Sequence, residues 1–127
     1  MAEVKGAVRP LSPHLQIYRL PITAITSILT RITGHALMAG VVLAVWWLLA
    51  AALGDGPFAI ANAAATSWFG DLVFTLSLWA IWYHYCAGLR HLYYDAGHGL
   101  EKAESLRLSW VIIAASVVLT ILTIVII

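Results

Sequence analysis

The sequence predicts an all-α membrane protein with three transmembrane helices, and three observations support this fold class. The chain has 127 residues, of which 62% are hydrophobic and only 10% are charged. Its mean hydropathy is +0.91, well outside the range of soluble globular domains. Three separate stretches are long enough to cross a bilayer, which takes about 20 apolar residues per helix. These predicted spans are 27–53, 68–92 and 108–127.

We expect residues 1–127 to form one transmembrane anchor domain, in which 1–26 are a cytoplasmic arm and the entry into the first helix. Pro10, Pro13 and Pro21 each interrupt helix and favour extended backbone at the preceding residue. Pro21 also suits the first turn of a helix. The opening residues resemble neither a secretory signal nor a mitochondrial transit peptide, so we expect them to be retained and the source to be bacterial.

The connections between the spans differ in character. The sequence GDGP at 54–57 predicts a turn, and FAIANAAATSWFGD at 58–71 predicts an interfacial loop because it lacks a clear apolar face. The glycines and charges of DAGHGLEKAESLR at 95–107 predict a helix end followed by a solvated connection. The third span has no ionisable residue and is expected to be scaffold.

Basic residues near the ends of the spans predict the orientation of the chain in the membrane. The loop after the first span has no Lys or Arg. The N-terminal segment and the loop after the second span are therefore expected in the cytoplasm, with the C-terminus on the periplasmic side of a bacterial inner membrane. Membrane lipids are expected partners, and nucleic acid is not. The basic residues used in this argument are Lys5, Arg9, Arg19, Arg31, Arg90, Lys102 and Arg107.

Ionisable side chains cluster at the end of the second span, in HYCAGLRHLYYD. An Arg or Asp at the centre of a membrane costs about 2.5–3.5 kcal/mol, so such residues are read as functional by default. At 100° per residue Gly88, His91 and Asp95 all lie within about 40° of His84 on one helix face. Arg90 points about 120° away from His84.

This face of the second span suits a haem. Iron requires a neutral imidazole nitrogen, and a flat macrocycle requires a helix surface with no bulky side chain beside the ligand. His84 is the candidate axial ligand, Gly88 provides the flat surface, and His91 is placed to meet a propionate. The alternative is that Gly88 allows close helix packing and the histidines hydrogen-bond between helices. The single cysteine, Cys86, excludes covalent haem attachment through C-x-x-C-H and any four-cysteine cluster.

The first span carries a second polar group in TSILTRITGH. Ser27 and Arg31 are one helical turn apart, and Gly34 returns to the same side. A hydroxyl and a permanent cation on one face suit a quinone carbonyl or a haem propionate. The alternative is that Arg31 extends to the interface and Ser27 bonds to its own helix. His35 lies at a depth close to that of His84, so an intrachain pair of axial ligands remains open.

Three motifs together resemble those of the cytochrome b membrane anchor subunit of succinate dehydrogenase, respiratory complex II. They are RPLSPHLQIY at 9–18, SILTRITG at 27–34 and HYCAGLRHLYYDAG at 84–97. The resemblance covers most of residues 9–99, and the third span matches in architecture only. It implies a three-helix subunit that pairs with a second small membrane anchor subunit and anchors the flavoprotein and iron–sulfur subunits on the cytoplasmic side.

The resemblance also implies roles for individual residues. His84 would be one axial ligand of a b-type haem, with the other ligand from the partner anchor subunit. Ser27 and Arg31 would line the ubiquinone site, and Arg31 and His91 would lie near the haem propionates. Many relatives have a histidine before the arginine of the first motif, where this chain has Thr30, so the role of that histidine is not transferred here.

The implied activity is electron transfer from the iron–sulfur subunit to ubiquinone, with proton uptake from the cytoplasmic side. Ser27 and Arg31 would orient the quinone and stabilise developing negative charge on its oxygen. The chain has no flavin motif and no cluster ligands, so it is expected to belong to an enzyme without oxidising succinate itself. The alternatives are the anchor of a fumarate reductase, a purely structural anchor, and a small transporter subunit with an intramembrane proton relay.

Overall fold

The computed structural model describes residues 10–127, which form four helices. Three of them are long and apolar enough to cross a membrane, so the prediction of an all-α protein with three membrane-length helices is confirmed. Lys5 and Arg9, two of the basic residues that predict the orientation of the chain, lie outside the described residues. The helices are α1 (Ile22–Leu53), α2 (Asp55–Ala65), α3 (Trp68–Asp95) and α4 (Lys102–Ile126).

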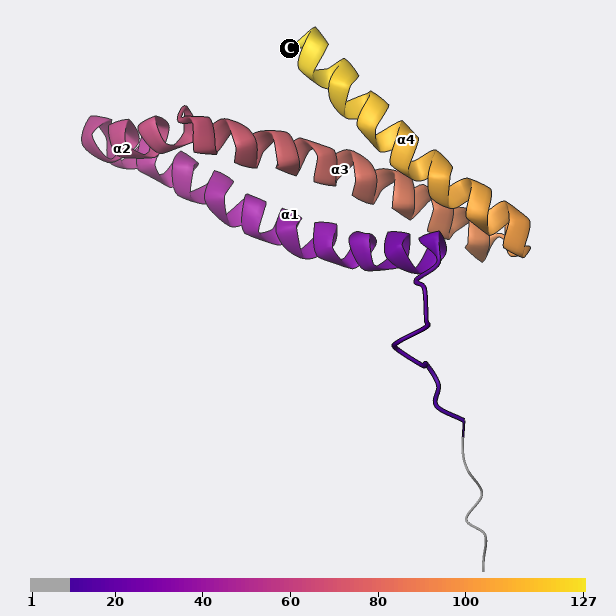
Figure 1. The fold of residues 1–127 in the computed structure, drawn as a ribbon. Helices are drawn as coiled ribbons and strands as arrows, with labels where there is room; N and C mark the ends of the chain where they lie inside the picture. The colour runs from indigo at the N-terminus through magenta and orange to yellow at the C-terminus, as the bar shows by residue number, and fades with distance from the viewer. Residues whose placement is uncertain (1–9) are drawn as a thin grey trace, which may run out of the picture.

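The three long helices pack as an open bundle (Figure 1). The helices α1 and α3 run side by side, and the short α2 connects them at one end of the bundle. The helix α4 packs against α3 and α1 at the other end, and its C-terminal half diverges from α1. That half stays bonded to α3, since Nε1 of Trp82 donates to Oγ1 of Thr123 at 2.9 Å. The start of α1, the end of α3 and the start of α4 therefore meet at the same end.

The segment before α1 agrees with the expected arm. Residues 10–21 are not helical and run away from the bundle in Figure 1. Pro21 has extended backbone and directly precedes the helix. Its carbonyl oxygen accepts hydrogen bonds from the amides of Ala24, at 3.0 Å, and Ile25, at 3.2 Å. Helix formation thus begins at the residue where proline no longer restricts the backbone.

The prediction of an interfacial loop over 58–71 was wrong, because α2 covers most of it and α3 begins within it. The turn predicted at 54–57 reduces to Gly54, which has a positive φ of 112°. Pro57 lies in the first turn of α2, where an amide hydrogen would have no intrahelical partner, so it does not interrupt the helix. The alanines that follow are the strongest helix formers.

Packing against α1 explains why this short helix is stable without a wide apolar face. The rings of Trp47 in α1 and Phe58 in α2 meet edge to face, with centroids 5.6 Å apart. Ala61 is completely buried. A few close contacts with a neighbouring helix therefore stabilise α2 in place of a wide apolar face.

The helix α3 has a defined signal at each end. Ser67 caps the N-terminus, since its Oγ accepts a hydrogen bond from the amide of Gly70 at 3.1 Å. At the C-terminus Gly97 has a φ of 82°, its amide bonds to the carbonyl of Tyr94, and the amide of His98 bonds to the carbonyl of Tyr93. This pair of bonds is a Schellman motif, so the predicted glycine stop is confirmed.

The interior of the bundle is small and lies between α3 and α4. Its centre is formed by Tyr83, Cys86 and Ala87 of α3 together with Ile112 of α4. Small or hydroxyl-bearing residues recur on the buried face of α4, which lets the helix backbones approach closely, as is common within membranes. The buried residues of α4 are Ser109, Ile112, Ser116 and Thr120.

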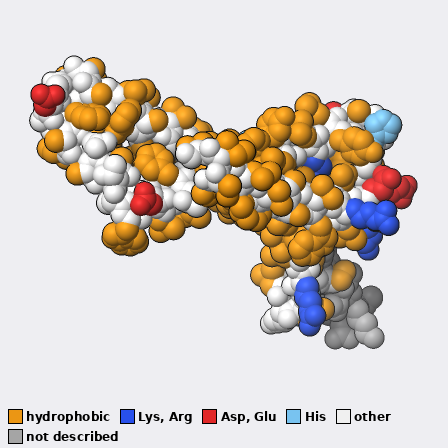
Figure 2. Space-filling view, turned by 90° about the horizontal axis from the view of Figure 1, so that it is seen from above, with side chains coloured by type: hydrophobic (Ala, Val, Ile, Leu, Met, Phe, Trp, Pro, Cys, Tyr) orange, Lys and Arg blue, Asp and Glu red, His pale blue; other side chains and the backbone are white. Residues whose placement is uncertain are grey.

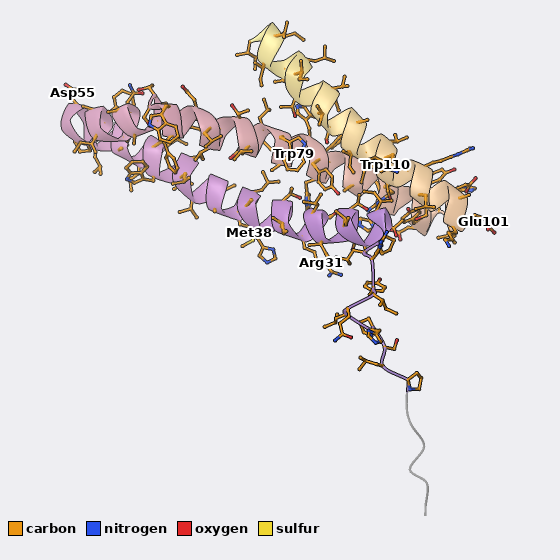
Figure 3. The ribbon with its side chains drawn as sticks, in the orientation of Figure 1. Arg31, Met38, Asp55, Trp79, Glu101 and Trp110 are labelled. Atoms are coloured by element: carbon orange, nitrogen blue, oxygen red, sulfur yellow. The ribbon has the colours of Figure 1, made fainter. Side chains whose placement is uncertain are left out.

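The outer surface reflects an apolar environment. Hydrophobic side chains cover the middle of the molecule in Figure 2, and Lys and Arg lie toward one end. Figure 3 labels acidic residues at the two extremes, Asp55 at the start of α2 and Glu101 in the connection before α4. Most charged residues thus lie near or beyond the ends of the long helices, as expected for spans of a bilayer.

The contact between α2 and α3 at Gly70 provides a test of the fold. A Cβ added at Gly70 would overlap the backbone carbonyl oxygen of Ala65 and lie 2.6 Å from that of Ala64. Neither oxygen can move without shifting α2. We expect Gly70→Ala to lower the free energy of unfolding by about 1–3 kcal/mol. Thermal unfolding of the protein in detergent, followed by circular dichroism, measures this effect.

The matched control is Gly56→Ala in α2, where an added Cβ meets nothing within 4 Å. That variant is expected to unfold at the wild-type temperature or slightly above it, because alanine is the better helix former. Equal unfolding temperatures for the Gly70 and Gly56 variants would show that the corner between α2 and α3 is not closely packed.

Candidate functional site

His84 lies half-buried in α3, where its imidazole contacts α1. Its Nδ1 is 3.1 Å from the carbonyl oxygen of Thr30 and 3.2 Å from Oγ1 of Thr33. The Thr33 hydroxyl donates its own hydrogen to the carbonyl of Leu29 at 2.8 Å, so toward His84 it acts as an acceptor. Two acceptors therefore face Nδ1.

These two acceptors indicate which ring nitrogen carries the hydrogen in the neutral imidazole. Only a nitrogen that carries hydrogen can donate to a carbonyl oxygen, so Nδ1 is the protonated nitrogen of His84. The lone pair then lies on Nε2. No hydrogen bond joins Nε2 to another side chain or carbonyl within residues 10–127. His84 is thus held by one nitrogen, while the other is available to a ligand.

Two glycines lie close to this imidazole in sequence or in space, with different surroundings. A Cβ added at Gly34 of α1 would lie 3.1 Å from Cε1 of His84, so the ring packs directly on the α1 backbone. A Cβ added at Gly88, one turn from His84 on α3, would meet nothing within 4 Å. The space over Gly88 is open in this chain, as the flat surface expected there requires.

The remaining residues of the predicted His84 face lie on the surface. His91 and Asp95 are exposed. The ring of His91 lies edge-on to the ring of Tyr94, with centroids 6.4 Å apart. The structure therefore places His91 on the outside of α3, two turns nearer to its C-terminus than His84, without a contact between the two imidazoles.

The polar group of α1 faces outward. Ser27 is half-buried and Arg31 is exposed. Arg31 lies on the side of α1 away from α3 and near the end of the bundle where the helix termini meet (Figure 3). Because the guanidinium is not directed into this bundle, it is available to a ligand or to another chain.

His35 does not join His84. It is exposed, and its Nδ1 is 2.7 Å from the carbonyl oxygen of Arg31 in the same helix. The imidazole of His84 meanwhile lies against α1 at Gly34, which leaves no room for a macrocycle between this ring and α1. The arrangement therefore argues against the intrachain pair of ligands that sequence arithmetic left open.

A buried polar group at the junction of three helices was not predicted. Arg90 is only 5% exposed, and its Nη1 donates to Oγ1 of Thr26 in α1 at 2.9 Å and to Oγ of Ser109 in α4 at 3.2 Å. The hydroxyl of Tyr83 donates to the carbonyl of Thr26 at 2.8 Å. Thr26 and Ser109 are both completely buried. Arg90 therefore connects α1, α3 and α4.

The guanidinium of Arg90 is only partly satisfied. Its Cζ lies 5.7 Å from the centre of the Tyr94 ring, which provides a cation–π contact. Its Nε is buried and has no hydrogen-bond partner among the described residues. The positive charge is thus solvated by hydroxyl groups and an aromatic face instead of a carboxylate, and loss of any one of these partners is expected to be costly.

A signal for this junction was present in the sequence. Tyr83, Ala87, Arg90 and Tyr94 recur at intervals of three or four residues, which places them on one face of α3. This face is next to the one that carries His84. What the sequence lacked was the identity of the facing residues on α1 and α4, since the relative rotation of neighbouring helices is set by packing.

The fold and the polar groups within it define an integral membrane protein of three spans, with ionisable side chains concentrated toward one end. Residues 6–123 match the family described as the succinate dehydrogenase/fumarate reductase transmembrane subunit. The chain belongs to this family. The resemblance identified from the three sequence motifs is thereby confirmed.

Individual relatives agree with this assignment. The chain is 58% identical over 126 residues to the succinate dehydrogenase cytochrome b556 subunit of Paracoccus denitrificans, covering 99% of this chain and 97% of the relative. It is 36% identical over 115 residues to the protein of the same description from Rickettsia felis, covering 90% and 89%. It is also 38% identical over 100 residues to the mitochondrial cytochrome b560 subunit of Sus scrofa, covering 75% of this chain and 57% of that one.

The Arg90 junction provides the test for this part of the structure. Thr26→Val keeps the shape of the side chain but removes an acceptor from a buried cation. We expect the free energy of unfolding to fall by about 1.5–3 kcal/mol, the range for a hydrogen bond to a charged group. Thermal unfolding in detergent measures the change.

Thr120→Val is the matched control for this measurement. Thr120 is also buried, and its Oγ1 bonds only to the carbonyl of Ser116 in its own helix, at 2.7 Å. Its replacement is expected to change stability by less than about 1 kcal/mol. If the two valine variants unfold alike, the bond from Arg90 to Thr26 makes no special contribution.

Proposed function

We propose that the chain is the haem b- and ubiquinone-binding membrane anchor subunit of succinate dehydrogenase. In this role it passes electrons from the iron–sulfur subunit to ubiquinone. The observation that carries the proposal is the state of His84, which is held at Nδ1 by α1 and has no hydrogen-bond partner at Nε2 among the described residues, while the helix surface at Gly88, one turn along α3, is open. The descriptions of the relatives as cytochromes b of succinate dehydrogenase support it.

The residues present fit a b-type haem. A neutral imidazole with its lone pair on Nε2 is the form that binds iron, and a carbonyl that accepts a hydrogen bond from the other nitrogen is the usual companion of such a ligand. When bound, the haem would supply reversible one-electron chemistry. His84 would be its axial ligand, and Arg31 and His91, which are both exposed, would serve its propionates.

The second axial ligand is proposed to come from outside this chain. The imidazole of His84 is packed on α1 at Gly34, and His35 is bonded to its own helix. A haem held by His84 would therefore lie toward the outer surface of the bundle. A second small membrane anchor subunit at that surface would complete the iron coordination, so the cofactor would be shared between two subunits.

Ser27 and Arg31 are proposed to bind ubiquinone. Reduction of ubiquinone requires two electrons and two protons, and charge develops on the carbonyl oxygens as electrons arrive. A hydroxyl and a guanidinium placed beside one oxygen would orient the ring and stabilise that charge. Arg31 suits this role because it is exposed and its planar guanidinium presents several N–H donors.

The surroundings of the subunit follow from the same proposal. The start of α1 and the connection between α3 and α4 would face the cytoplasm, where the iron–sulfur and flavoprotein subunits would dock, and the C-terminus would face the periplasm. Residues 1–127 would act as one anchor domain in a bacterial inner membrane. A fumarate reductase anchor would share this architecture, but the relatives named above carry the succinate dehydrogenase description.

The proposal is tested by the reduced-minus-oxidised absorption spectrum of the purified complex. We expect His84→Ala to abolish the b-type signal, because iron would lose an axial ligand. His35→Ala should retain the signal, because its imidazole is bonded to the Arg31 carbonyl. Loss of the signal in both variants, with the complex assembled, would instead indicate an intrachain pair. Retention in His84→Ala would contradict the assignment of His84.

Quinone reduction provides a separate test. Arg31→Leu should lower kcat/KM for ubiquinone by about 10- to 100-fold, the equivalent of one hydrogen bond to a charged group. Ser27→Ala should lower it by about 3- to 10-fold, the equivalent of a neutral bond. Oxidation of succinate with a water-soluble electron acceptor should stay at the wild-type rate in both variants.

The control for this test is Arg107→Leu, which removes an exposed cation of α4 that has no place in the proposed quinone site. It is expected to leave kcat/KM for ubiquinone unchanged. A purely structural anchor predicts a different pattern, in which all three substitutions affect only the amount of assembled complex.

A further inference from the structure

We infer that α1 forms a seat for the imidazole of His84, and that this seat sets both the direction of Nε2 and its strength as a ligand. The seat consists of the Thr30 carbonyl oxygen, the Thr33 hydroxyl and the bare backbone at Gly34. This inference rests on the proposed ligation of haem by His84. It assigns positioning roles to residues of α1 that do not touch the iron.

Three contacts from a single turn of α1 fix the orientation of the ring. Nδ1 lies 3.1 Å from the Thr30 carbonyl oxygen and 3.2 Å from the Thr33 hydroxyl, so rotation of the imidazole would break both contacts. Thr33 is only 2% exposed, so water cannot readily replace its hydroxyl. The ring is therefore constrained by groups that are themselves fixed in a helix.

The same contacts determine the electron density at Nε2. A histidine that donates its other N–H to a carbonyl becomes a more basic ligand. A more basic ligand stabilises ferric over ferrous iron, which lowers the reduction potential, and such hydrogen bonds are one of the levers by which proteins tune haem. Of the two acceptors at Nδ1, only the Thr33 hydroxyl can be removed by a side-chain substitution, because the other is a backbone carbonyl.

Gly34 lies so close to the ring that an added side chain would force the ring to give by a few tenths of an ångström. Its added Cβ would lie 3.1 Å from Cε1, 3.7 Å from Nδ1 and 4.0 Å from Nε2. Cε1 is the atom between the two nitrogens, so pressure on it moves both the hydrogen-bonded and the metal-binding positions. Gly40 of the same helix has nothing within 4 Å of an added Cβ and provides a matched comparison.

The experiment compares the assembled complex carrying Thr33→Val, Gly34→Ala, Gly40→Ala or His84→Ala. Haem content per assembled complex, the haem midpoint potential from a redox titration, and the low-spin electron paramagnetic resonance signal are measured. Thr33→Val is expected to retain haem but to shift the potential upward, because one acceptor at Nδ1 is lost. Gly34→Ala is expected to lower haem retention by about 10-fold or more, or to shift the low-spin signal. Gly40→Ala should match the wild type.

The outcomes separate this inference from the proposed function. If His84→Ala loses haem while Thr33→Val and Gly34→Ala both match the wild type, His84 is a ligand but the seat has no influence, and the inference is wrong. If His84→Ala retains haem, His84 is not a haem ligand, and both the proposed ligation and the inference about the seat are wrong. Should Gly34→Ala fail to assemble, Thr33→Val decides alone, and an unchanged potential overturns the inference.

Discussion

The hydrogen bonds of one buried guanidinium determine how the helices of this protein meet. Within a membrane a polar group without a partner is costly, so Arg90 can be buried only where other helices bring acceptors to it. Thr26 of α1 and Ser109 of α4 provide them, and the hydroxyl of Tyr83 adds a bond to the backbone of α1. The register of α1 against α3 that follows brings Thr30 and Gly34 opposite His84.

Two neighbouring faces of α3 differ in their surroundings. One face carries Tyr83, Ala87 and Arg90, is buried, and holds the bundle together. The next face carries His84 and Gly88, where one imidazole edge rests on α1 and the adjoining helix surface stays open. Because both faces belong to one rigid helix, the packing that secures the first also positions the second. The face that packs the bundle and the face proposed to bind a ligand thus belong to the same helix.

Hydropathy was sufficient to predict the three spans, because crossing a bilayer demands length and apolarity above all. The helix α2 was missed because its start carries turn-forming residues and its stability comes from contacts such as that of Phe58 with Trp47. Helical angles correctly separated His84 from Arg90. They did not reveal that Arg90 is bonded between helices or that His84 rests on Gly34, because both depend on the rotation and depth of α1 relative to α3. Those quantities arise from side-chain packing, which no single-helix pattern contains.

The helices α1 and α3 lie side by side, and the chain joins them at one end only, through α2. His84 lies about 24 Å along α3 from that joint, so a tilt of about 5° there would move its imidazole by about 2 Å relative to α1. A displacement of this size exceeds the tolerance of a hydrogen bond. Hydrogen bonds hold α3 to α1 at the end of the pair that the chain does not join, and they come from Arg90, Tyr83 and His84. These bonds act where a tilt between the two helices would cause the largest displacement. Side-chain contacts, more than the chain connection, therefore maintain the geometry around His84.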